Sequence, residues 1–184
     1  MLLDSGLDLF EEKGYVLTTV DDIASGAGTT RTTFYVHFPS KADLMKDLIL
    51  DLNESLVASD DPPLAIVVKD GQRAPVRTWI ERKVQQWPEI RRCAMAAQAA
   101  AGSDSEIALA VNQWFESAIG DIHKGLNLAK RFEPKSRHAR ATLAFGQLEF
   151  LSRRWFDTGW TTLLPERPSV DLLVDSWCWL LLHN

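Results

Sequence analysis

Apolar residues recur every three or four positions along most of this chain, which is the period of amphipathic α-helices. In the first third, this pattern predicts a short helix near residues 3–13, a second over 20–27 and a longer one over 41–59. The longer helix contains neither glycine nor proline, so we expect a stiff rod of roughly 28 Å.

The rest of the chain repeats the helical pattern. Residues 60–73 have the composition of a loop or a weak helix, and the prolines at positions 75 and 88 each open a helix. Longer apolar stripes follow over 107–126, 136–158 and 169–184. The pattern as a whole predicts an all-α fold with about nine helices.

One stretch departs from this pattern. The segment "TTRTTFYVHFPSK", Thr29–Lys41, is rich in residues that favour β-strands. A lone strand between two helices would leave its backbone groups without partners, so the context favours a helix. In that helix Thr30 is the N-cap, and Phe34 and Phe38 share one face as core anchors. The short polar side chains then point outward.

The order of elements in this region predicts a DNA-reading motif. Thr19 and Asp22 form a capping pair at the start of the second helix, and Gly28 provides a turn before the third. Two short helices joined by such a turn form a helix-turn-helix. The second helix of the pair must enter the ~12 Å major groove and present hydrogen-bonding groups to the bases.

Residues 3–45 resemble the DNA-binding domain of TetR/AcrR-type transcriptional regulators. The resemblance rests on the stretches "LDLFEEKGY", "TTVDDIASGAG" and "FYVHFPSKADL" and on their spacing. Departures from the family's usual residues occur at Thr29, Thr30 and Thr32, where Val, Ser and Gly are common. These positions lie among the residues that face DNA, so the resemblance does not carry an operator sequence with it.

The resemblance implies two domains, a helix-turn-helix domain over 1–46 and a domain for ligand binding and dimerisation over 47–184. It implies phosphate contacts from one set of residues, namely Thr19, Tyr35 and Lys41. It implies contacts in the groove from another set, namely Thr30, Arg31, Thr33 and His37. The cation of Lys41 in the first turn of a helix opposes the helix dipole, which favours an external anion over an ordinary solvated lysine.

Family membership would also imply a regulatory mechanism. The expected protein is a homodimer through residues 136–158 and 169–184 that binds a palindromic operator and acts as a repressor. A small effector would release it by favouring a spacing of the two recognition helices that misses successive grooves.

Charge limits how such a protein could hold DNA. Residues 1–55 carry four basic and ten acidic side chains, a net charge of −6, whereas the whole chain carries −5. A general basic patch is therefore absent, and we expect few phosphate contacts per half-site with a shallow salt dependence. No apolar run approaches the ~20 residues of a bilayer span, and two cysteines, Cys93 and Cys178, suit reduced core thiols. The expected location is the cytoplasm, without membrane association.

Seven tryptophans are the most informative residues beyond position 55. Core packing is the simpler interpretation of each one alone, but together they could line an aromatic cavity for a hydrophobic or aromatic effector. The candidate lining residues are Trp79, Trp87, Met95, Gln98, Trp114, Phe115, Phe145, Gln147 and Phe150. His123 and His138 lack partners at metal-ligand spacing, so we expect neither a metal nor another cofactor.

Two other functions compete with a regulator. A helical enzyme is disfavoured because "GAGTTR" lacks the third glycine of GxGxxG, and the HExxH, GxSxG and P-loop patterns are absent. A dimeric helical adaptor without sequence-specific DNA binding is the alternative that the acidic N-terminal domain keeps open.

Overall fold

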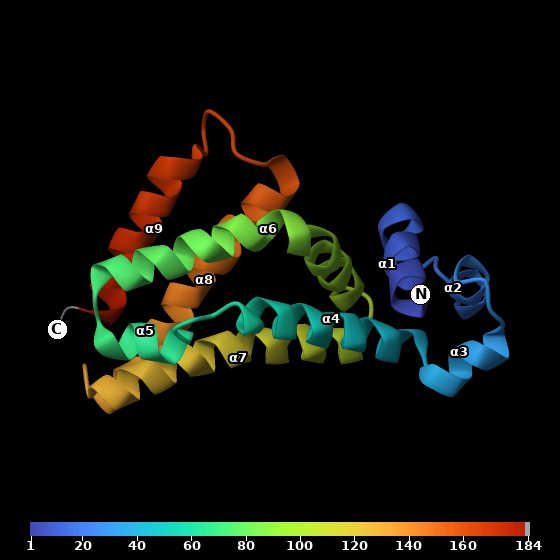
Figure 1. Ribbon diagram of the computed structural model, residues 1–184, viewed down its shortest axis with the longest axis horizontal. Helices are drawn as coiled ribbons and strands as arrows, with labels where there is room; N and C mark the ends of the chain where they lie inside the picture. The colour runs from blue at the N-terminus through green and yellow to red at the C-terminus, as the bar shows by residue number, and fades with distance from the viewer. Residues whose placement is uncertain (183–184) are drawn as a thin grey trace. The chain divides into compact units, whose positions relative to one another are not determined.

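The computed structural model describes residues 1–182. These residues form nine α-helices and no strand, which confirms the all-α prediction (Figure 1). In chain order the helices are α1 (Leu2–Lys13), α2 (Val20–Gly26), α3 (Arg31–His37), α4 (Lys41–Ala58), α5 (Leu64–Asp70), α6 (Arg73–Ala101), α7 (Ser105–Ala129), α8 (Pro134–Thr158) and α9 (Glu166–Leu181). None of them has the length and apolar content of a bilayer span. The last two residues of the segment expected over 169–184 lie outside the described part of the chain.

Two helical boundaries differ from the sequence prediction. Pro88 does not open a new helix but lies inside α6, which runs unbroken for 29 residues. The proline removes one hydrogen bond from the helix interior. Trp87 before the proline is 3% exposed and Ala94 beyond it is 0% exposed. Burial of these side chains stabilises the helix on both sides of the missing hydrogen bond.

The second difference is α5, where the sequence indicated a loop or a weak helix. Leu64, Val67 and Val68 are buried in this helix, and Gly71 ends it in the left-handed conformation with φ 67°. Gly125 of α7 makes the close packing possible, since a Cβ at that position would lie 2.6 Å from the carbonyl oxygen of Ala65. A seven-residue helix is marginal by itself, so this tertiary contact decides its existence.

The chain divides into two compact units. One comprises Met1–Ser55 and Glu89–Trp114, and the other comprises Leu56–Pro88 and Phe115–Asn184. The functional division between residues 46 and 47 that the family resemblance implies stays a prediction.

The first unit has a core built from α1 to α4. Ile23 of α2, Phe34 of α3, and Leu44 of α4 are completely buried, and Phe10 of α1 is 4% exposed. Gly6 lets α1 approach α4, because a Cβ there would lie 2.7 Å from a methyl group of Leu44. The three short helices therefore pack around one apolar centre at the start of the chain (Figure 1).

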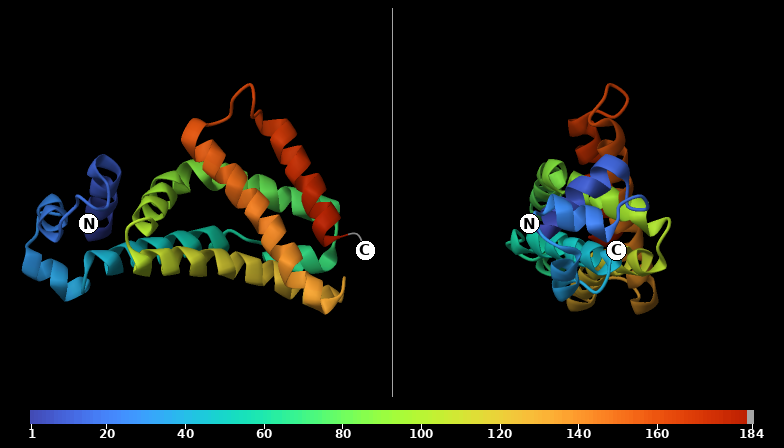
Figure 2. Two further views of the ribbon diagram at one scale, coloured as in Figure 1. Left: turned by 180° about the vertical axis from the view of Figure 1, so that it is seen from behind. Right: turned by 90° about the vertical axis from the view of Figure 1, so that its right-hand side faces the viewer.

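The second unit is organised around stacked tryptophans and a buried ion pair. Trp79 of α6 stacks on Trp177 of α9 with ring centroids 5.4 Å apart, and the Trp177 indole N–H donates to the carbonyl of Ala144 in α8 at 2.9 Å. The Trp79 indole N–H donates to Asp60 at 3.0 Å, and the same carboxylate pairs with Lys83 at 2.7 Å. Burial lowers the pKa of Lys83. These contacts connect α6, α8 and α9, which lie close together in Figure 2.

Arginines after α7 satisfy carbonyl groups at the ends of other helices. Arg131 donates to the carbonyls of Val68 at 2.8 Å, Lys69 at 2.6 Å and Leu181 at 3.0 Å. Arg140 donates to the carbonyl of Leu180 at 2.8 Å. These side chains bind the last turns of α5 and α9, whose carbonyls have no partner within the helix.

Candidate nucleic-acid interface

Helix α3 lies where the sequence indicated a recognition helix. Thr30 is its N-cap, and its hydroxyl accepts a hydrogen bond from the Thr33 amide at 3.2 Å. Phe34 is 0% exposed and anchors the helix, whereas the next residue, Tyr35, is 46% exposed. His37 is exposed at the last turn. The helix thus combines a buried aromatic root with mostly polar side chains on its solvent side, where Val36 is an apolar exception at 76% exposed.

Thr33 and His37 share one face of α3, as their spacing predicts. Both line a cleft of about 360 Å³ in the first unit. The remaining lining residues come from the start of α1, from the α2–α3 turn and from just after α3, and they are Met1, Leu2, Leu3, Ala27, Thr29 and Phe38.

The start of α2 is held by a capping box. The Thr19 hydroxyl accepts from the Asp22 amide at 3.1 Å, and the Asp22 carboxylate accepts from the Thr19 amide at 2.8 Å. Lys13 pairs with the same carboxylate at 2.7 Å. The Lys13 ammonium and the Thr19 hydroxyl and amide hold the pKa of Asp22 well below its usual value. Thr19 is exposed, but its oxygen already serves the cap.

Arg31 opens α3 and is held by two neighbours. Its Nη1 donates to Asp21 of α2 at 2.9 Å, and its Nη2 donates to the Tyr35 hydroxyl at 3.3 Å. The guanidinium also lies 5.5 Å from the centroid of the Tyr35 ring. These contacts bring together three exposed side chains, two of which the sequence marked for DNA contact.

Lys41 is the first residue of α4, as its sequence position indicated, but its ammonium has protein partners that the sequence did not predict. Its ammonium donates to the carbonyls of Tyr15 at 2.6 Å and Thr18 at 2.8 Å, and it lies 4.1 Å from the Tyr15 ring centroid. Burial lowers the pKa of this lysine. Since an ammonium has three donors, one N–H remains for a phosphate. The phosphate contact stays a prediction, but Lys41 also fixes the loop between α1 and α2.

Tyr15 ends the first stretch that carries the family resemblance, but the sequence by itself predicted no role for it in this site. Its hydroxyl donates to Asp104 at 2.8 Å, across 89 residues of chain. Asp104 also accepts from the amides of Glu106 and Ile107 at the start of α7. Burial, followed by the hydrogen bond to this carboxylate, raises the pKa of Tyr15.

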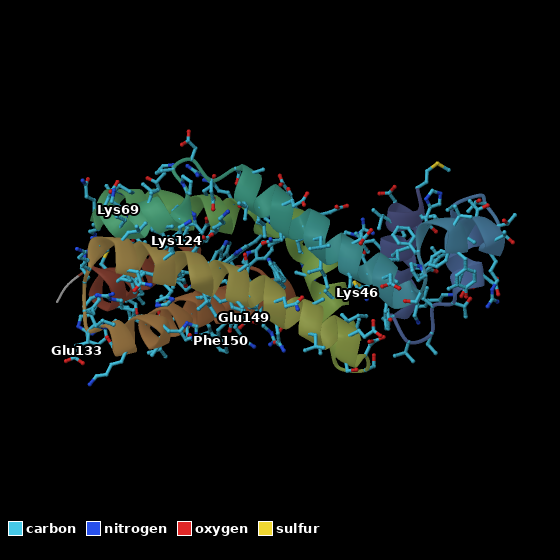
Figure 3. All side chains as sticks on the ribbon, turned by 90° about the horizontal axis from the view of Figure 1, so that it is seen from below. Lys46, Lys69, Lys124, Glu133, Glu149 and Phe150 are labelled. Atoms are coloured by element: carbon cyan, nitrogen blue, oxygen red, sulfur yellow. The ribbon has the colours of Figure 1, made fainter. Side chains whose placement is uncertain are left out.

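Two further polar contacts join the helix-turn-helix to the same segment, Glu89–Trp114. Arg92 of α6 donates to Asp8 of α1 at 2.6 Å, and it also pairs with Glu11. Lys46 of α4, labelled in Figure 3, pairs with Glu106 at 3.0 Å. The paired residues are 84 and 60 positions apart in the sequence, so the periodicity of the chain could not predict these contacts.

These contacts have a common consequence for charge. Each of the four basic side chains within residues 1–55 already has a protein acceptor. Lys13 and Arg31 pair with Asp22 and Asp21, Lys41 binds two carbonyls, and Lys46 pairs with Asp43 at 2.6 Å as well as with Glu106. DNA therefore meets cations whose charge is already shared with the protein's own acceptors.

The structure divides the predicted effector-binding residues between the two compact units. Met95, Gln98 and Trp114 belong to the first unit, and the other six belong to the second. Within the second unit Trp79 packs on Trp177, and Phe115 packs on Phe145 with centroids 5.5 Å apart. Trp87 packs instead against a separate group, Trp155, Phe156 and Trp160. Gln147 and Phe150 are exposed, the latter at 65%.

The second unit also contains a charged cleft that the sequence did not indicate. It has a volume of about 760 Å³ and lies between α6 and α9. Its walls include two ion pairs, Arg73 with Asp175 and Arg77 with Asp171. The charges in this cleft are therefore largely matched within the protein.

His123 and His138 approach each other across α7 and α8, although the sequence offered no reason to pair them. Their ring centroids are 5.6 Å apart. Within residues 1–182, no group of three or more His, Cys, Asp or Glu side chains could hold a metal ion.

Comparisons with known proteins agree with this geometry. Residues 2–48 match the family model described as bacterial regulatory proteins, tetR family. The chain is 29% identical to the HTH-type transcriptional regulator TtgR of Pseudomonas putida, covering 97% of this chain and 86% of that protein. It is 28% identical to the regulator EthR of Mycobacterium tuberculosis, covering 96% and 83%. These relatives are transcriptional regulators and not enzymes.

Solved structures show the same fold. The SmeT–triclosan complex superposes with a TM-score of 0.78 at 17% identity, covering all of this chain and 90% of that one. A second structure of SmeT, the repressor of the Stenotrophomonas maltophilia multidrug efflux pump SmeDEF, gives a TM-score of 0.73 at 17% identity. That alignment covers 100% of this chain and 89% of the other.

The two carbonyl contacts of Lys41 generate a test of its role. Lys41→Met keeps the aliphatic stem and removes the ammonium, so we expect the free energy of unfolding of the DNA-free protein to fall by about 1–3 kcal/mol. Urea unfolding measures this change. Lys13→Met, which removes a partly exposed ion pair, is the control and should cost at most about 1 kcal/mol. If Lys41→Met weakens DNA binding without changing stability, the ammonium serves only as a phosphate ligand.

Proposed function

We propose that this chain, whose residues 2–48 match the tetR family model, is a DNA-binding transcriptional regulator. In this proposal it is a dimeric repressor that a small hydrophobic or aromatic effector releases from DNA. The observation that supports DNA reading best is the construction of α3. A completely buried Phe34 fixes this helix while Arg31, Tyr35 and His37 are exposed around it. A site of action in the cytoplasm belongs to the same proposal.

We assign the two kinds of DNA contact as follows. Side chains on the outer surface of α3 read base edges in the major groove, where donors and acceptors distinguish all four base pairs. The groove-reading residues are Thr30, Arg31, Thr33 and His37. The residues that position the protein on the phosphates are Thr19, Tyr35 and Lys41. The last of these has one N–H donor left for this purpose, because its other two bind carbonyls.

Exposed apolar side chains on α8 and α9 support a homodimer. Leu143 and Phe150 lie seven residues apart on α8, and Leu172 and Trp179 lie seven residues apart on α9, each at least 60% exposed. Residues seven apart lie on the same face of a helix. Phe150 is labelled on α8 in Figure 3. We propose that these faces form the dimer interface within residues 136–158 and 169–184, of which 183 and 184 lie outside the described part.

A two-fold axis through such an interface would place two copies of α3 on successive turns of one DNA face. That spacing is about 34–36 Å, and the operator would be a palindrome. The affinity of one reading head would be low because its cations are few and already held, so we expect useful binding from the dimer alone.

The effector proposal rests on the aromatic side chains of the second unit and on the relative SmeT, which is described in complex with triclosan. Pockets between the helices of a bundle are typically apolar with a few polar groups, and a pocket of that kind would suit a compound of this chemistry. The effector must bind better to the conformation that fits DNA poorly, because a ligand shifts an equilibrium only by its differential affinity. Trp79, Trp87, Phe115 and Phe145 stay the candidate contacts in the second unit.

DNA reading can be tested with substitutions on α3. Selection from random duplexes should first yield a palindromic operator. Arg31→Ala combined with Tyr35→Ala should then weaken its binding at least about 30-fold, because two lost contacts of about 1–3 kcal/mol each sum to at least about 2 kcal/mol. Lys135→Ala removes an exposed cation from α8 and should leave affinity unchanged. Absence of any selected sequence would favour the adaptor alternative.

The dimer face can be tested with a matched pair of leucines. Leu172→Glu buries a charge in the proposed interface, so we expect sedimentation to show a monomer that keeps its helical circular dichroism and loses operator binding. Leu163 is 97% exposed in the α8–α9 connection, outside both faces. Leu163→Glu should therefore remain a dimer. A dimeric Leu172→Glu protein would place the interface elsewhere.

Effector binding can be followed through the tryptophans. A panel of small hydrophobic aromatic compounds, triclosan included, should contain members that quench tryptophan fluorescence and release the operator at the same concentrations. Phe145→Ala should raise the concentration required, by removing apolar contact area. The proposal fails if saturating compounds change neither fluorescence nor DNA binding.

A further inference from the structure

Asp21 and Arg31 join the two helices of the helix-turn-helix by one exposed ion pair. The carboxylate of Asp21 lies in the first turn of α2, and Arg31 is the first residue of α3. Their atoms are 2.9 Å apart, and the side chains are 61% and 59% exposed. Arg31 is also the only lysine or arginine between residues 14 and 40. The permanent positive charge that this segment can offer a phosphate therefore comes from that one guanidinium.

The carboxylate cancels most of this attraction. A phosphate that approaches the ion pair meets two opposite charges whose sum is zero. A phosphate that breaks the pair and binds Arg31 leaves the unpaired Asp21 carboxylate beside the polyanion. Exposed ion pairs are weak, so the exchange is possible. It is nevertheless less favourable than binding of a free arginine.

The pair does not block contact with a base. A guanidinium has five N–H donors. One is used by Asp21 and one by the Tyr35 hydroxyl, which leaves three free and holds the group in a fixed orientation. A held arginine can therefore donate to the acceptor edge of a base while its ion pair stays intact. Binding to phosphate as a free cation requires the pair to break.

We propose that Asp21 is a specificity-determining residue, whose carboxylate restrains Arg31 and so weakens binding to DNA of arbitrary sequence more than binding to the operator. The reason is that phosphate attraction supplies essentially all of non-specific binding, whereas base contacts add to it at the operator. The inference rests on the proposed operator reading and adds the role of an acidic side chain that touches no base.

The test is the ratio of two affinities. Asp21→Asn should tighten binding to a scrambled duplex about three- to tenfold and change binding to the selected operator less than twofold, so that the specificity ratio falls. The freed arginine neutralises one more phosphate per chain, so the log–log salt slope for scrambled DNA should steepen by about 0.9 per chain. Asp21→Ser, which cannot keep an amide contact with Arg31, should give the same result.

A control substitution separates a local effect from net charge. Asp47→Asn makes the same charge change at an exposed position on α4. It should raise both affinities alike and leave their ratio unchanged. In an Arg31→Gln background, Asp21→Asn should lose most of its effect on scrambled DNA. Circular dichroism and thermal unfolding check that each variant is folded.

Three results would overturn the proposal. One is an equal change in both affinities for Asp21→Asn, and another is a loss of operator binding with scrambled DNA unaffected. The third is a fall in specificity for Asp47→Asn as large as that for Asp21→Asn. A wild-type protein that prefers no operator over scrambled DNA would instead contradict the proposed function, and this is measured before any variant is made.

Discussion

Burial of Phe34 is the constraint on which the reading surface depends. Helix α3 has seven residues, too few to be stable in water by itself, and its threonines and aromatic residues favour other conformations. The completely buried ring attaches it to α2 and α4 through the core that contains Ile23 and Leu44. Because one face is fixed in this way, the opposite side chains can remain polar and exposed without loss of the helix.

The electrostatics of the same region follow a second principle, which is internal pairing. A DNA-binding domain with only four basic side chains would be expected to leave those cations free to contact the DNA phosphates. Instead carboxylates hold Lys13, Arg31 and Lys46, and carbonyls hold Lys41. DNA can therefore bind these cations in two ways: through the N–H donors that remain on Arg31 and Lys41, or by displacing the protein's own acceptors. Affinity then depends on which of these two ways a particular site allows.

The second unit depends on aromatic stacking and on charged groups that satisfy backbone carbonyls. Trp177 contacts Trp79 through its ring and Ala144 through its N–H, so one side chain joins three helices. Arg131 similarly donates to carbonyl groups in the last turns of two helices, α5 and α9. The tryptophans proposed to line a ligand cavity thus have structural roles as well. One ring can serve both roles only if one of its faces remains accessible to the ligand.

The periodicity of the sequence by itself determined the helical class, the helix-turn-helix and its anchor Phe34, because a 3.6-residue period and N-capping residues act over one or two turns. The second predicted anchor, Phe38, follows α3 in an extended conformation and is only half-buried. Thr19, Thr30 and Phe34 hold the places that this pattern indicated. Tertiary structure decided that α5 forms and that α6 continues through Pro88, since burial outweighs local preference there. It also decided the partners of Arg31, Lys41 and Tyr15. Ion pairs and hydrogen bonds between residues 10 to 89 positions apart leave no periodic trace, so only the folded chain shows which charges remain available to a ligand.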